Sequence, residues 1–274
     1  HCILNKTISA LRQRKSQQEK FSVVAAYDAS FAAAINQACV DAILIGDSLG
    51  MVVQGKTSTL PVSIDEMAYH THCVARRCEQ DSNAALIIAD MPFMSYDNCD
   101  NALQNAAKLM RAGANMVKLE GGTWLAPTVK AMSDNGIPVC AHLGLTPQSV
   151  NKLGGYKVQG KDEDAKRVLL DDALALEDAG VDFLVLECIP SQFAKMVTER
   201  LQISTIGIGA GADTDAQVLV AYDLIGLTSS KARFVKNFLT ADNLSSDNPI
   251  VDALAAFDRD VKNGSYPAEQ HQYH

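Results

Sequence analysis

Eight short apolar runs, each followed by a stretch of helical character, constrain the fold of this 274-residue chain more than any other feature. The runs occupy residues 21–27, 42–47, 84–90, 114–122, 137–142, 181–187, 203–209 and 217–223. A strand–helix unit that repeats along a chain predicts a parallel sheet with right-handed crossovers. Eight such units predict closure into a (β/α)8 TIM barrel, with a doubly wound open sheet as the alternative.

Two further segments lie outside these units. Residues 7–20 are polar and predict an amphipathic helix, which either caps one end of the barrel or lies against another subunit. The tail over residues 229–274 is expected to be mostly helical, with turns at Asn248 and Asn263. Neither a repeat nor a linker indicates a second domain. Residues 1–274 are therefore predicted to form one domain, with residues 1–6 expected to be disordered or foreign to it.

The composition narrows the class of protein. A net charge of −8 argues against nucleic acid or an anionic membrane as a partner. No run has the length of a membrane span, and the N-terminus lacks the apolar core of an export signal. The seven cysteines are odd in number and irregular in spacing, which predicts free thiols in a reducing cytoplasm. His70, His72, Cys73 and Cys78 lack the spacing of a zinc site.

The second to sixth runs carry ionisable side chains at or near their carboxyl ends. These residues are Asp47, Asp90, Lys118, Glu120, His142 and Glu187. Barrel enzymes build their sites at the carboxyl ends of the strands. One such carboxylate would fit a helix cap or a salt bridge. Four carboxylates, a lysine and a histidine at corresponding positions predict one shared pocket, where so many negative charges require a cation.

The types of side chain indicate a hard cation such as Mg2+ and a substrate with adjacent oxygens, such as a 2-oxo acid. Asp47 and Asp90 are short and lie at strand ends, so they are candidates to bind the metal directly, and the longer Glu120 to bind it through water. Lys118 would neutralise the substrate, and Glu187 would take a proton from the carbon beside the carbonyl. A Lys118–Glu120 salt bridge is the competing structural interpretation, because the two side chains share a face of their strand.

Longer motifs carry a family resemblance. With GDSLGM at residues 46–51, KLEGG at 118–122, HLGLTPQS at 142–149 and YPAEQHQYH at 266–274, the sequence resembles the 3-methyl-2-oxobutanoate (ketopantoate) hydroxymethyltransferase family over nearly its whole length. The resemblance implies Mg2+-dependent transfer of the one-carbon unit of 5,10-methylenetetrahydrofolate onto 3-methyl-2-oxobutanoate, giving 2-dehydropantoate for pantothenate synthesis. It also implies a (β/α)8 barrel in a cytoplasmic homo-oligomer, usually a decamer, whose C-terminal region helps to hold neighbouring subunits together.

The resemblance also assigns roles to residues. It places Asp47, Asp90 and Glu120 at the metal, Asp47, Ser48, Asp90, Lys118 and His142 at the 2-oxo acid, and Glu187 at the proton transfer. The sequence departs from the family at Cys39, where Gly is usual, and at Ala212 and Ala216, where Asn and Gly are common. These departures concern loop geometry and folate contacts rather than the reaction class.

Two other functions are open at this point. A carbon–carbon lyase or phosphonomutase of the isocitrate-lyase-like barrels would use a related site, but the KKCGH-type loop with its reactive cysteine does not occur in this sequence. A non-catalytic barrel would require a broken site, whereas every residue that the mechanism needs is present.

Overall fold

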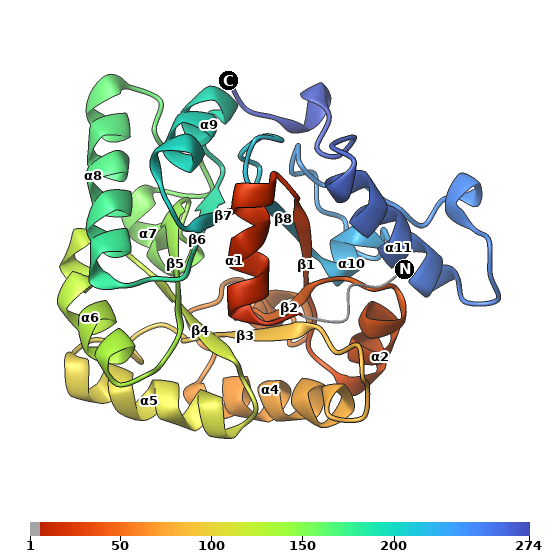
Figure 1. The fold of residues 1–274 in the computed structure, drawn as a ribbon, viewed down its shortest axis with the longest axis horizontal. Coiled ribbons are helices and arrows are strands. Elements are labelled where there is room, and N and C mark those ends of the chain that lie inside the picture. The colour runs from red at the N-terminus through yellow and green to blue at the C-terminus, as the bar shows by residue number, and fades with distance from the viewer. Residues whose placement is uncertain (1–5) are drawn as a thin grey trace.

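Eight parallel strands close into a barrel in sequence order (Figure 1) in the computed structural model, which describes residues 6–274. The strands are β1 (Phe21–Ala25), β2 (Ala42–Ile45), β3 (Leu86–Asp90), β4 (Met116–Glu120), β5 (Val139–Gly144), β6 (Phe183–Glu187), β7 (Ser204–Ile208) and β8 (Ala216–Val220). Pairing of β1 with β8 closes the barrel. The predicted (β/α)8 architecture is confirmed, and the doubly wound alternative is wrong.

Helices surround the barrel (Figure 1). The longer ones are α1 (Ile8–Gln17), α2 (Ala29–Gln37), α4 (Ile64–Cys78), α5 (Cys99–Arg111), α6 (Ala126–Asp134), α8 (Glu163–Ala179), α9 (Ser191–Arg200) and α11 (Pro249–Lys262). Three single-turn helices lie in the connections: α3 (Leu49–Val52), α7 (Val150–Leu153) and α10 (Ala221–Leu224). No helix within residues 6–274 has both the length and the apolar character needed to cross a bilayer.

Polar side chains determine where most of the longer helices begin. Each of these cap residues accepts a hydrogen bond from a backbone N–H of the first turn: Thr7, Asp28, Ser63, Asn98, Asp162 and Asn248. At Ser63 the cap is reciprocal, because the Glu66 carboxylate accepts from the Ser63 backbone N–H. These residue types satisfy the free donors of a helix start, so the sequence itself sets the boundaries.

The N-terminal helix α1 caps the barrel at the end where the strands begin, and it crosses the centre of the view in Figure 1. Leu11 of α1 is fully buried in a cluster inside the barrel that includes Phe21 and Phe183. The two phenylalanine rings lie 5.6 Å apart at their centroids. Of the two positions predicted for this helix, the barrel cap is the observed one.

The C-terminal tail is less helical than predicted. Of residues 229–274, all of them described, only α11 forms an α-helix, with single 3-10 turns at Ala241–Asn243 and Glu269–His271. Serines and an aspartate that compete for backbone hydrogen bonds explain the irregular part: Asp252 accepts from the backbone N–H groups of Ser245 and Ser246, at 2.8 and 2.7 Å. Helix α11 nevertheless packs on β1 and α2 and completes the outer layer.

Two predictions about single residues are wrong. The sequence predicts residues 1–6 to be disordered or foreign to the domain, but Lys6 is buried, and its Nζ donates to the carbonyls of Val40 (2.9 Å) and Asn83 (3.2 Å). Residues 1–5 lie outside the described residues. Cys39 was expected to be a free thiol but forms a disulfide, because a fold brings together cysteines whose spacing in the sequence gives no sign of pairing. The prediction of free thiols is confirmed for Cys73, Cys78, Cys99, Cys140 and Cys188.

A buried ion network joins both chain-end helices to the barrel. The Asp41 side chain is 1% exposed and lies 3.0 Å from the guanidinium of Arg14 in α1 and 3.0 Å from Nζ of Lys262 in α11. The backbone N–H of Ser22 in β1 also donates to Asp41, at 3.0 Å. Asp41 therefore compensates two cations, one of which, Arg14, is only 4% exposed.

Asp41→Asn should lower the free energy of unfolding by about 3–5 kcal/mol, because it leaves the buried Arg14 without its counter-charge. Urea unfolding followed by circular dichroism measures the change. Asp134→Asn is the matched control, since Asp134 pairs with Lys130 on an exposed face, and its cost should stay below about 1 kcal/mol. Equal costs for the two variants would contradict the role given to Asp41.

Candidate active site

The carboxyl ends of β2 to β6 bring the predicted ionisable residues together. Asp47 follows β2, Asp90 ends β3, Lys118 and Glu120 lie in β4, His142 lies in β5 and Glu187 ends β6. Each of them except Glu187 is at most 4% exposed. Glu187 keeps 14% of its side chain accessible, which makes it the most exposed carboxylate of this cluster.

Lys118 lies at the centre of the cluster. Its strand neighbour in register is Asp90, and its Nζ lies 3.0 Å from Oδ1 of Asp90 and 3.9 Å from Oε1 of Glu120. Burial lowers the pKa of Lys118, but the nearby carboxylates outweigh it and raise the pKa above its ordinary value. The Lys118–Glu120 ion pair that the sequence suggested is therefore present, but Asp90 is the closer partner.

His142 connects two carboxylates. Its Nε2 lies 3.0 Å from Oε2 of Glu187, and its Nδ1 lies 3.4 Å from Oε1 of Glu120. Burial and the Lys118 ammonium, whose Nζ is 3.1 Å from Nδ1, lower the pKa of His142. Glu120 and Glu187 more than compensate and raise the pKa to about 9. The imidazolium form is thus favoured near neutral pH, and it holds the Glu187 carboxylate in position.

Asp47 is buried near groups of its own charge, whereas Lys118 and His142 lie near groups of opposite charge. Burial and the neighbouring carboxylates of Asp90 and Glu120 raise the pKa of Asp47 well above its ordinary value. Its backbone N–H donates to Oδ2 of Asp90 at 2.9 Å, which fixes the distance between the two residues. The carboxylates therefore repel one another within a buried space.

Gln148 is a site residue that the sequence analysis did not single out. Its Nε2 donates to Oδ2 of Asp47 (2.9 Å) and to the Met91 carbonyl (3.0 Å), and its backbone N–H donates to Oε2 of Glu120 (2.9 Å). The Tyr96 hydroxyl donates to the Gln148 side-chain oxygen, which fixes the orientation of the amide. Gln148 thus positions two of the three predicted metal ligands. Its place in the TPQS run of a polar loop was the only signal in the sequence.

Ser48 is held from the other side of the site. Its hydroxyl is hydrogen-bonded to the hydroxyl of Tyr27, at 2.7 Å. Tyr27 is 2% exposed and follows β1, which was not among the strands predicted to contribute to the site. The first strand therefore supports the site through Tyr27.

A cavity of about 620 Å3 opens beside this cluster. Asp47, Ser48 and Glu187 line it. The Tyr156 hydroxyl, from the loop after β5, lies 3.6 Å from Sδ of Met51 in α3, and both residues line the cavity. The polar loop after β5 thus contributes to the wall of this cavity.

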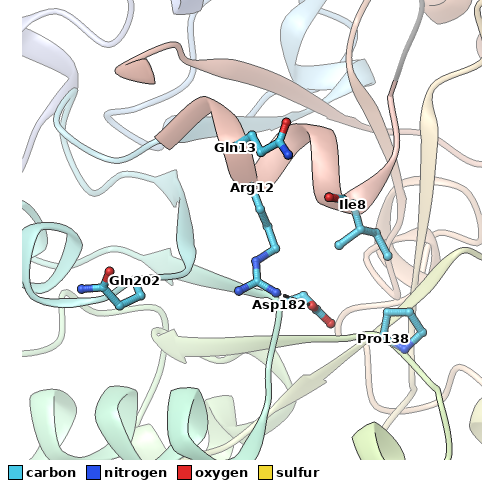
Figure 2. Close-up of a pocket in the computed structure, with 7 residues that line it drawn as sticks. Ile8, Arg12, Gln13, Pro138, Asp182 and Gln202 are labelled. Atoms are coloured by element: carbon cyan, nitrogen blue, oxygen red, sulfur yellow. Dashed lines mark hydrogen bonds and ion pairs between the residues drawn. The ribbon is translucent and has the colours of Figure 1, made fainter. Parts of the chain in front are cut away.

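A second cavity, of about 580 Å3, lies at the opposite end of the barrel (Figure 2). It lies beside α1, where Arg12 forms an ion pair with Asp182 at 3.1 Å. Pro138 and Gln202, which also line it, precede β5 and β7. This cavity is lined by none of the predicted site residues.

The arrangement of carboxylates suits a divalent cation, although within residues 6–274 no set of three or more His, Cys, Asp or Glu side chains already has the geometry of a metal centre. Oδ1 of Asp90 and Oε1 of Glu120 are buried and accept no well-formed hydrogen bond from the described residues, although each lies in an ion pair, with Lys118 and His142 respectively. Asp47 adds a third carboxylate, which these two repel. A hard cation would supply the additional positive charge that the carboxylates lack and relieve this repulsion.

The three departures from the family pattern lie away from the cluster. Cys39 precedes β2 and has a φ of 65°, in the left-handed region that favours glycine, which accounts for the Gly usual at this position. Ala216 begins β8, and the Ala212 carbonyl accepts from Nζ of Lys20 at 2.7 Å. None of the three lines the cavity beside the carboxylates.

Known proteins resemble this chain over almost its full length. A family model described as ketopantoate hydroxymethyltransferase matches residues 5–269. A protein of Marinobacter nauticus named 3-methyl-2-oxobutanoate hydroxymethyltransferase is 54% identical over 268 residues, which are 97% of this chain and 98% of the relative. A protein of the same name from Pectobacterium atrosepticum is 52% identical over 269 residues, which are 98% of each chain.

Solved structures share the architecture at low sequence identity. A phosphoenolpyruvate phosphomutase from Streptomyces platensis aligns with a TM-score of 0.61 and 15% identity, over 94% of this chain and 98% of that one. A phosphonopyruvate hydrolase in complex with oxalate and Mg++ aligns with a TM-score of 0.60 and 14% identity, over 95% of this chain and 99% of that one. These two likenesses concern the fold alone.

The stability of the metal-free protein should depend on pH through His142. The pKa of His142 in the folded state, about 9, exceeds the ordinary value of 6.5. The imidazolium therefore contributes its full stabilisation below about pH 6.5 and loses it as the pH rises through about 9. Relative to His142→Gln, the wild type should lose roughly 1–3 kcal/mol of unfolding free energy between about pH 6 and pH 10. Chemical unfolding in the presence of chelator measures this, and a pH-independent difference between the two proteins would contradict it.

Proposed function

The chain belongs to the ketopantoate hydroxymethyltransferase family, and we propose that it adds a hydroxymethyl group to 3-methyl-2-oxobutanoate. The one-carbon donor is 5,10-methylenetetrahydrofolate, and the products are 2-dehydropantoate and tetrahydrofolate. Carbon 3 of the 2-oxo acid loses a proton and bonds to the donor's methylene carbon, whose two C–N bonds break. Water supplies the hydroxyl oxygen, and the two carrier nitrogens take up the proton from carbon 3 and one proton from water. The observation that carries the proposal is a cavity lined by Asp47, Ser48 and the accessible Glu187, which lies beside the buried ammonium of Lys118 and its carboxylate partners.

Asp47, Asp90 and Glu120 would hold a divalent metal, which we propose to be Mg2+. Their burial, their mutual repulsion and the buried oxygens of Asp90 and Glu120 that accept no well-formed hydrogen bond support this assignment. When bound, the metal would act as a Lewis acid that polarises the 2-oxo carbonyl and makes the neighbouring carbon more acidic. Gln148 supports the arrangement by holding Asp47 and Glu120 through separate donors.

Glu187 is the proposed base. Its carboxylate lines the cavity, and it is more accessible than the other site carboxylates. Nε2 of His142 lies 3.0 Å from the Glu187 carboxylate, and this ion pair orients the carboxylate. We propose that Lys118 and Ser48 bind the negatively charged 2-oxo acid, with Tyr27 fixing the Ser48 hydroxyl. His142 completes the substrate pocket.

The competing functions have less support. Family membership over nearly the whole chain favours hydroxymethyl transfer over a lyase or phosphonomutase, because the solved mutase and hydrolase structures share only 14–15% identity with this chain. A non-catalytic barrel would not need Glu187 to stay accessible in a cavity while the other carboxylates are buried.

The assembly and location of the protein rest on the family resemblance. We propose a cytoplasmic homo-oligomer, specifically a decamer, in which residues 229–274 contribute contacts between subunits. A mass by light scattering close to that of one 29.4 kDa chain would contradict this proposal.

Glu187→Gln should slow the metal-dependent exchange of the C3 proton of 3-methyl-2-oxobutanoate by roughly 100- to 10,000-fold, because the amide cannot accept the proton. Proton NMR in D2O measures the exchange, and calorimetry should still detect binding of the 2-oxo acid. Glu199→Gln, on the exposed face of α9, is the control and should exchange at the wild-type rate. Exchange at the wild-type rate in Glu187→Gln would exclude Glu187 as the base, and wild-type exchange that persists with chelator would exclude the metal.

A further inference from the structure

The cavity beside Glu187 is larger than a small 2-oxo acid requires. Its volume of about 620 Å3 falls in the range of pockets that enclose a ring-containing ligand. Besides the residues already described, it is lined by residues of β8 and the segment that follows, including Val220, Asp223 and Phe234. This part of the wall has no role in the proposed proton transfer.

Asp223 is the unexplained group in that wall. It lies in α10, and its Oδ1 accepts a hydrogen bond from the Thr228 hydroxyl. Within residues 6–274, no other side chain or backbone group donates to this carboxylate and no cation pairs with it, even though Lys157 and Lys231 line the same cavity. Burial raises the pKa of Asp223, which records the cost of holding an unpaired carboxylate there.

The surroundings of Asp223 suit a flat ring. Ile208 and Val220 line the cavity together with the aromatic rings of Phe234 and Tyr273. Tyr273 is well fixed, because the Ser191 backbone N–H donates to its carbonyl at 2.8 Å and the Arg233 guanidinium lies 5.3 Å from its ring centroid. Apolar walls with one carboxylate recognise a planar molecule that carries N–H donors on one edge.

We propose that Asp223 binds the donor edge of the one-carbon carrier, namely the ring N–H and the adjacent exocyclic amine of its pterin. A carboxylate accepts two parallel N–H bonds from such an edge, as it does from a guanidinium. It retains enough lone pairs for the Thr228 hydroxyl as well. This inference rests on the proposed function, and it extends that function by naming the residue that recognises the carrier.

The chemistry of the carrier fits the extent of the cavity. The donor edge of a pterin lies at the far side of the ring system from the nitrogen that carries the reacting carbon. Asp223 and Glu187 line the same cavity but come from different strand ends, those of β8 and β6. A carrier held by Asp223 would therefore be anchored by the end that does not react.

A structural role in the turn is the alternative. Asp223 closes the turn after α10, through the Thr228 hydroxyl and through its carbonyl, which accepts from the Gly226 N–H at 3.1 Å. Two variants separate the roles. Asp223→Asn keeps an oxygen for Thr228 but presents an amide donor, whereas Thr228→Val removes the turn hydrogen bond and keeps the carboxylate.

The test measures binding of tetrahydrofolate and of its 2-desamino analogue by calorimetry, with the full-length wild type and both variants. Asp223→Asn should weaken tetrahydrofolate binding roughly 10- to 100-fold. The wild type and Thr228→Val should prefer tetrahydrofolate over the analogue by about tenfold or more, and Asp223→Asn should reduce that preference to about threefold or less. A lost preference for tetrahydrofolate over the analogue indicates direct contact with Asp223, because a disturbed turn would weaken the binding of both ligands equally.

Two outcomes would overturn the inference. In the first, Asp223→Asn prefers tetrahydrofolate over the analogue as strongly as the wild type does, so Asp223 does not recognise the carrier. In the second, Thr228→Val loses as much affinity and as much preference as Asp223→Asn, so the turn and not the carboxylate is responsible. The C3 proton exchange of the wild type, measured without carrier, keeps this result apart from the proposed function. If the wild type exchanges the C3 proton but either of these two outcomes is found, only the assignment of Asp223 is refuted. If the wild type neither exchanges the proton nor binds tetrahydrofolate, both the assignment and the proposed function are refuted.

Discussion

The register between neighbouring parallel strands is the constraint on which this site depends. Closure of β1 onto β8 fixes the stagger of the strands around the barrel, so that Asp90 stands beside Lys118 and Glu120 beside His142. A slip of one residue in any pairing would turn a site residue toward the outer helices. The chemistry of the cluster therefore depends on backbone hydrogen bonds distant from it in the sequence.

The charges gathered by this register do not balance within the cluster. Four carboxylates face one ammonium and one imidazolium, and burial together with the neighbouring carboxylates raises the pKa of Asp47. Burial of charge without full compensation is expensive. Such a cost is usual where a protein keeps a place for a ligand of opposite charge. The buried network at Asp41, by contrast, balances its charges more nearly and ties α1 and α11 to the barrel.

The strands and the residues at their ends could be predicted from the sequence, because their apolar side chains recur at a regular spacing. Side chains alternate between the two faces of a strand, so the sequence alone places Asp90 and Glu187 at strand ends and on the same face as their apolar neighbours two residues away. Gln148 and Tyr96 could not be found in this way, because they reach the site from loops whose path depends on tertiary packing. The tail was misjudged for a related reason, since local hydrogen bonds to Asp252 replace helix there. The roles of the site residues remain predictions.

The cap formed by α1 determines from which side ligands reach the cavity beside Glu187. Leu11, Phe21 and Phe183 fill the barrel at one end, so the chamber beside Glu187 is approached from the other. Substrates and products must therefore enter and leave on the side where the strands end. The apolar packing beneath α1 thus sets the direction of exchange with solvent, although it contains none of the predicted site residues.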